Sequence, residues 1–81
     1  MGTLRVLSHE GDTRTSWDQR AAAAGDPEAV AAIREAERIF AEARARGASA
    51  LSVASGRPPV RLDRFDPAAE QILIVPRVLG G

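Results

Sequence analysis

Cysteine and lysine are both missing from this 81-residue sequence, and histidine occurs once, as His9. Without cysteine the chain cannot form disulfides, thiolate metal sites or a cysteine nucleophile. A single histidine also excludes a metal site built from several imidazoles. Because all 11 basic residues are arginine, no side-chain amine is present as an acylation target. This bias, together with abundant alanine, favours a GC-rich bacterial or phage genome.

An excess of charge of either sign is also missing, since 11 basic residues balance 11 acidic ones. This balance argues against nucleic acid or an anionic membrane as the partner. No apolar run approaches the roughly 18 residues that span a bilayer, and no signal-peptide pattern is seen at the N-terminus. We therefore expect a single cytoplasmic domain with one modest core.

The first part of the chain has the pattern of a β-hairpin followed by a connection. Polar and apolar residues alternate over Thr3–Ser8, and a turn signal follows at Gly11 and Asp12. In a strand over Thr13–Trp17, the two threonines and the tryptophan would share one face. Residues 18–25 are rich in alanine but interrupted by Gly25, so we expect a connection, with a helical turn and a loop both left open by the sequence. Trp17 is expected to pack on the sheet or the helix, with a role in partner binding as the alternative.

Residues 27–46 carry the strongest signal, that of an amphipathic helix. Asp26 is a good N-cap, Pro27 suits the first helical position, and Gly47 suits the end of a helix. Apolar residues recur at three- and four-residue spacing, which predicts a buried face. They are Ala29, Ile33, Ala36, Phe40 and Ala43.

Three further strands are expected after the helix. Residues 48–54 and 60–65 alternate, the second more weakly, and residues 66–71 resemble one helical turn capped by Asp66. The run Ile72–Val75 is wholly apolar, which is typical of a strand central in its sheet. The order predicts an α+β fold, a β-grasp with a mixed sheet of four to five strands and one long helix across one face. In this arrangement the last strand lies parallel to the first.

The end of the chain, "ILIVPRVLGG", carries a resemblance. The ββαββ order and the Gly80-Gly81 end resemble ubiquitin-like β-grasp proteins, and the tail is similar to that of the molybdopterin synthase small subunit and related sulfur carriers. The resemblance covers the whole chain as topology but only about the last ten residues as motif. Arg77 departs from the carriers' pattern, because many of those carriers have a second proline at this position. The long helix and residues 18–25 also depart from it. The matching positions are Ile72, Ile74, Pro76, Val78, Gly80 and Gly81.

The resemblance implies a β-grasp domain over residues 1–76 and a flexible tail over 77–81. It also implies that a partner adenylating enzyme of the ubiquitin-activating type activates the carboxylate of Gly81 for sulfur transfer or conjugation. Gly80 and Gly81 would let the tail thread a narrow channel, because glycine has no Cβ. The further partners implied are an acceptor protein or synthase subunit and a metal-dependent deconjugating peptidase, and no cofactor is implied.

Partner contacts are expected from the tail and from the sheet face away from the helix, which should carry Arg5 and Leu7, with Leu73 or Val75 adding an apolar patch. Four late arginines, Arg57, Arg61, Arg64 and Arg77, suit either a partner surface or charged strand edges that prevent edge-to-edge pairing. We assign partner binding to Arg77, Val78, Leu79, Arg64 and Leu7.

No residue set points to catalysis by the chain itself. Ser8, His9 and Asp12 share a turn with Glu10, and turns favour such residues without forming a triad or a metal site. The alternative to a carrier or modifier is a non-covalent β-grasp adaptor or accessory subunit of a bacterial or phage assembly. The sequence leaves open sulfur transfer, conjugation and simple docking.

Overall fold

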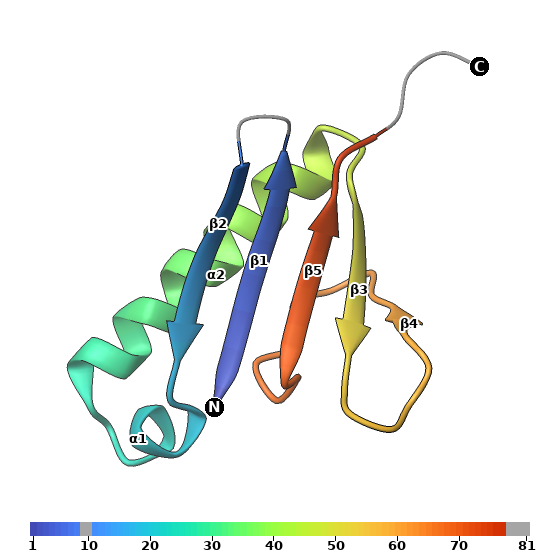
Figure 1. Cartoon of the computed structure of the whole chain (residues 1–81). Coiled ribbons are helices and arrows are strands. Elements are labelled where there is room, and N and C mark those ends of the chain that lie inside the picture. The colour runs from blue at the N-terminus through green and yellow to red at the C-terminus, as the bar shows by residue number, and fades with distance from the viewer. Residues whose placement is uncertain (9–10, 78–81) are drawn as a thin grey trace.

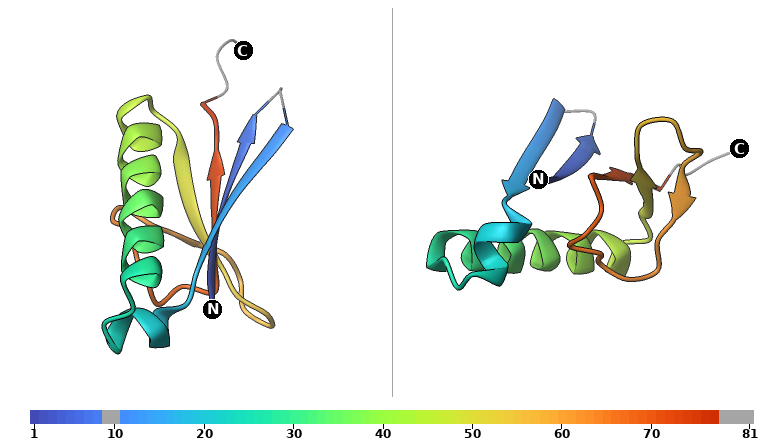
Figure 2. Two further views of the ribbon diagram at one scale, coloured as in Figure 1. Left: turned by 90° about the vertical axis from the view of Figure 1, so that its left-hand side faces the viewer. Right: turned by 90° about the horizontal axis from the view of Figure 1, so that it is seen from below.

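The computed structural model describes residues 1–8 and 11–77 and folds them into two layers, a sheet and a helix (Figure 1). The long helix α2 crosses one face of the sheet, as the side view in Figure 2 shows. The elements are β1 (Gly2–Ser8), β2 (Gly11–Trp17), α1 (Gln19–Ala23), α2 (Pro27–Ala45), β3 (Ser49–Val53), β4 (Val60–Arg61) and β5 (Gln71–Val75).

The described strands form one mixed sheet in the order β2-β1-β5-β3-β4. β1 and β5 are parallel, and the other neighbouring strands are antiparallel. β5 therefore lies in the middle, next to the first strand, as its apolar run predicts. The α+β class, the mixed sheet and the single long helix are confirmed.

The two ends of α2 are capped by the residues predicted to begin and end the helix, Asp26 and Gly47. The Asp26 side chain accepts a hydrogen bond from the Glu28 amide at 3.1 Å. At the other end Gly47 has φ +91°, and the Ala48 amide donates to the Ala43 carbonyl at 3.0 Å. None of the helices within residues 1–8 and 11–77 has the length and apolar character to cross a membrane.

The core lies between α2 and the inner face of the sheet. Its sheet side is formed by side chains that are almost completely buried, and Ala36 and Phe40 of α2 cover them. Trp17 closes one end of this core, where it is 2% exposed and its Nε1 donates to the Pro67 carbonyl at 3.0 Å. Packing of Trp17 is thus confirmed over exposure to a partner. The sheet contributes Leu4, Ala50, Ile72 and Ile74.

Two expected elements differ from the structure. The strand expected over residues 60–65 ends at Arg61, because Leu62 and Phe65 pack inward against the core. Phe65 joins an aromatic cluster, with ring centroids 5.3 Å from Trp17 and 5.9 Å from Phe40. This burial draws the chain away from the sheet edge.

The helical turn expected over residues 66–71 is a hydrogen-bonded turn that forms no helix. Asp66 Oδ1 accepts from the Ala68 amide, and the Asp66 carbonyl accepts from the Ala69 amide. Gln71 is already part of β5, where it pairs with Thr3. The short helix α1, in contrast, confirms the helical turn allowed within residues 18–25.

Candidate functional site

The sheet face away from α2 has an apolar centre with arginines on both sides. Leu4 and Ile72 point into the core, so strand alternation places their neighbours Arg5 and Leu73 on the opposite face. Leu51 and Leu73 are only partly buried there. One row across all five strands consists of Arg14, Arg5, Leu73, Leu51 and Arg61.

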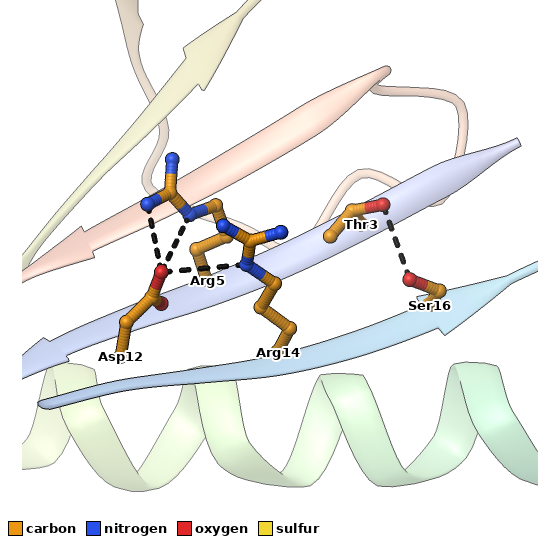
Figure 3. A network of polar contacts seen from close by, with 5 residues as sticks. All are labelled: Thr3, Arg5, Asp12, Arg14 and Ser16. Atoms are coloured by element: carbon orange, nitrogen blue, oxygen red, sulfur yellow. Dashed lines mark hydrogen bonds and ion pairs between the residues drawn. The ribbon is translucent and has the colours of Figure 1, made fainter.

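Asp12 holds two arginines together on this face (Figure 3). Its Oδ2 accepts hydrogen bonds from Arg5 Nη2 at 2.7 Å and Nε at 3.1 Å, and from Arg14 Nε at 3.3 Å. The hydrogen bond from Arg5, helped by Arg14, lowers the pKa of the Asp12 carboxyl below its ordinary value. One carboxylate facing two guanidinium groups leaves a local excess of positive charge.

Arg77 follows β5 and lies against the C-terminal end of α2. A Cβ placed on Gly47 would lie 3.1 Å from Arg77 Cδ and 3.7 Å from its Nη1. Because the last carbonyls of a helix carry partial negative charge, this end of α2 favours a cation. Glycine at position 47 therefore serves two purposes, since it allows the positive φ and leaves room for Arg77.

A groove of about 390 Å³ lies between the C-terminal end of α2 and the ends of β1 and β5. Ala43 and Ala48 line it on the helix side, and Val6 and Ile74 line it on the sheet side. Leu7, Arg46 and Arg77 also contribute to its lining. Two of the predicted partner-binding residues, Leu7 and Arg77, are thus brought to one place.

Arg64 lies elsewhere. It is exposed in the bend after β4 and lines a separate depression next to Phe40 and Arg44 of α2. Arg44 in turn pairs with Asp63, with Nη2 3.6 Å from Oδ1. The four late arginines therefore do not form one cluster: Arg61 belongs to the outer face, and Arg57 lies in the connection between β3 and β4.

Several predicted residues fall outside the described part of the chain. Val78, Leu79, Gly80 and Gly81 are among them, so their assignment to the reactive tail stays a prediction. The same holds for His9 and Glu10. The assignment of residues 77–81 as a separate tail also stays a prediction, because only Arg77 of this range is described.

Two features were not recognised in the sequence, one at the groove and one on the outer sheet face. Arg46 was not singled out from the sequence, although it lines the groove together with Arg77. Asp12 was explained by turn formation, although it is the partner of Arg5 and Arg14. The hairpin register would have predicted this second feature, because it places Arg5 opposite Arg14 and Asp12 opposite Leu7.

Comparison of the chain with protein-family models, with curated proteins and with solved structures found no match.

Proposed function

We propose that the chain is a β-grasp domain of the ubiquitin-like kind, and that it acts as a carrier or protein modifier through the carboxylate of Gly81. The observation that carries this proposal is the position of β5. The strand lies in the middle of the sheet, parallel to β1, and runs into Pro76 and Arg77 on the way to Gly80-Gly81.

This placement of β5 suits a protein whose C-terminal residues are bound and modified by another enzyme. β5 is hydrogen-bonded on both sides, and Ile72 and Ile74 anchor it in the core. Pro76 lacks an amide hydrogen and so cannot extend the ladder. A partner enzyme can therefore bind the residues after Pro76 without breaking the hydrogen bonds of β5.

The chemistry proposed for the tail needs no catalytic group from the chain. A carboxylate oxygen of Gly81 attacks the α-phosphorus of ATP in the partner enzyme, pyrophosphate leaves, and an acyl adenylate forms. Sulfide or a thiol then attacks the acyl carbon and releases AMP, which gives a thiocarboxylate or a thioester. An amine of an acceptor protein can displace the thiol to form an amide. The proposal requires Gly81 to be the last residue of the active chain.

The test is incubation of the full chain with lysate of its host, with and without ATP. We expect an ATP-dependent covalent product that maps to Gly81, and no product from a variant that lacks Gly81. A matched control, Arg20→Gln on the exposed surface of α1, should react like the original chain. A product that forms equally without Gly81 would contradict the proposal.

A second candidate is a non-covalent adaptor, and the outer sheet face favours it. Leu51 and Leu73 form a partly exposed apolar centre flanked by Arg5 and Arg61, a composition found at protein interfaces. For an adaptor, Leu73→Asp should abolish partner capture while deletion of Gly81 leaves it unchanged. For a carrier, deletion of Gly81 abolishes the function.

A further inference from the structure

We propose that the groove at the C-terminal end of α2 binds an acidic peptide segment of a partner protein, with one large apolar side chain of that segment inserted between α2 and the sheet. This inference goes beyond the proposed function, because it requires no chemistry at Gly81.

The groove follows from the way the two layers separate. Figure 2 shows the β1–β2 hairpin diverging from α2 toward the end where the helix terminates. The twist of a sheet produces such divergence between its strands and a straight helix. Only large side chains on α2 would fill the space that opens between the helix and the hairpin. At this end Ala43 and Ala48 are the apolar residues that the helix and the turn after it contribute to the lining, and a groove of about 390 Å³ remains.

The apolar lining explains the apolar half of the ligand. Val6 and Ile74 form the sheet side of the groove, and Leu7 and Pro76 extend its apolar lining. Removing a large apolar side chain from water against such surface favours binding. The volume is also within the range of small pockets that bind specific ligands.

The charges explain the acidic half. Arg46 and Arg77 line the groove, and none of its lining residues within the described chain is acidic. Neither guanidinium forms an ion pair with a described carboxylate. The contrast with Arg38 is clear, because Glu35 and Glu42 both pair with that arginine on the exposed side of α2. Two unpaired cations beside an apolar groove are complementary to carboxylates that flank an apolar side chain.

The test is a titration of the full, isotope-labelled chain with the synthetic peptide acetyl-Glu-Glu-Leu-Phe-Glu-amide, followed by amide and methyl NMR shifts. We expect shifts centred on Val6, Ala43, Ala48 and Ile74. The peptide in which each Glu is replaced by Gln should bind more weakly, and the peptide with Ser-Ser in place of Leu-Phe should not bind.

Variants separate the two halves of the site. Arg46→Gln should weaken binding about three- to fivefold, the size expected for one exposed ion pair. Arg20→Gln, an exposed arginine on α1, is the matched control and should leave the affinity unchanged. Ala43→Leu should fill the groove and abolish binding without lowering the free energy of unfolding, because the added side chain occupies existing space.

Three results would overturn the proposal. They are the absence of shifts at millimolar peptide, shifts confined to the outer sheet face around Leu51 and Leu73, and unchanged binding by Ala43→Leu. Equal affinity for the Glu and Gln peptides would overturn the role of the arginines. A variant without Gly81 should bind the peptide normally, so failure of this proposal and failure of the carrier function are distinguishable.

Discussion

At the scale of single residues, Gly2 and Trp17 pair across the β1–β2 ladder, and the indole lies close to the Gly2 backbone. A Cβ on Gly2 would lie 2.3 Å from Trp17 Cε2. The indole has little freedom to move away, because it is buried, packs on Phe65 and is hydrogen-bonded to the Pro67 carbonyl. Only glycine fits at this position.

We therefore predict that Gly2→Ala lowers the free energy of unfolding by about 1–3 kcal/mol, the usual cost of overpacking a core. Urea denaturation followed by the fluorescence of Trp17 measures it. Ser49→Ala, at an exposed position in β3, should change stability by less than about 0.5 kcal/mol. Equal stability of Gly2→Ala and the original chain would show that the indole is not held in place.

Asp12 gives the fold a dependence on pH. The pKa of its carboxyl is lowered in the folded state, chiefly by the hydrogen bond from Arg5 and also by Arg14. A lowered pKa stabilises the fold above the ordinary carboxylate range, and this contribution is lost as the pH falls through the folded-state value. Glu35, whose pKa Arg38 lowers, acts in the same direction.

The expected result is a difference in unfolding free energy between the original chain and Asp12→Asn that is constant from about pH 7 to pH 5 and shrinks below about pH 4. Urea denaturation at several pH values and low ionic strength measures it. Because these groups face solvent, 1 M salt should reduce the difference. A difference that grows on acidification would have the wrong sign.

At the scale of elements, α2 depends on its first residues more than on its exposed charges. Asp26 caps the helix by accepting from the Glu28 amide, and Pro27 occupies the first turn. The pairs of Arg38 with Glu35 and Glu42 are exposed, and such pairs contribute little.

Replacing Asp26 by Ala should therefore lower the free energy of unfolding by about 1 kcal/mol, whereas Asp26→Asn should retain most of it. Chemical denaturation monitored by circular dichroism at 222 nm measures both. Equal loss in the Ala and Asn variants would mean that charge, and not the cap hydrogen bond, matters at this position.

Elements with a local signal could be predicted from the sequence. Strand alternation located β1 and β2, the cap and the apolar spacing located α2, and the run at Ile72–Val75 located the central strand. The segment between β4 and β5 could not be predicted, because its path depends on Phe65 meeting Trp17 and Phe40, which are far apart in the sequence. Arg46 was missed at the groove for the same reason, since its neighbours Val6 and Ile74 come from the sheet.

At the scale of the whole molecule, the groove lies at the end toward which β5 runs. α2 terminates there, β1 and β5 both run toward it, and Arg77 lies against Gly47 (Figure 1). The opposite end holds α1 and the turn after Phe65, and in this turn the Pro67 carbonyl accepts a hydrogen bond from the buried Trp17. A partner that approached the end of β5 would thus meet the groove and Arg77 together.

The most direct test of the central claim is the intact mass of the protein purified from its native host, followed by peptide mapping of its C-terminus. The account predicts a gain of about 16 Da at Gly81, the oxygen-to-sulfur difference of a thiocarboxylate, or a Gly81 carbonyl joined to a lysine of another protein. An unmodified Gly81 carboxylate that stays unchanged after incubation with ATP and host lysate, or a native chain that continues past Gly81, would contradict it.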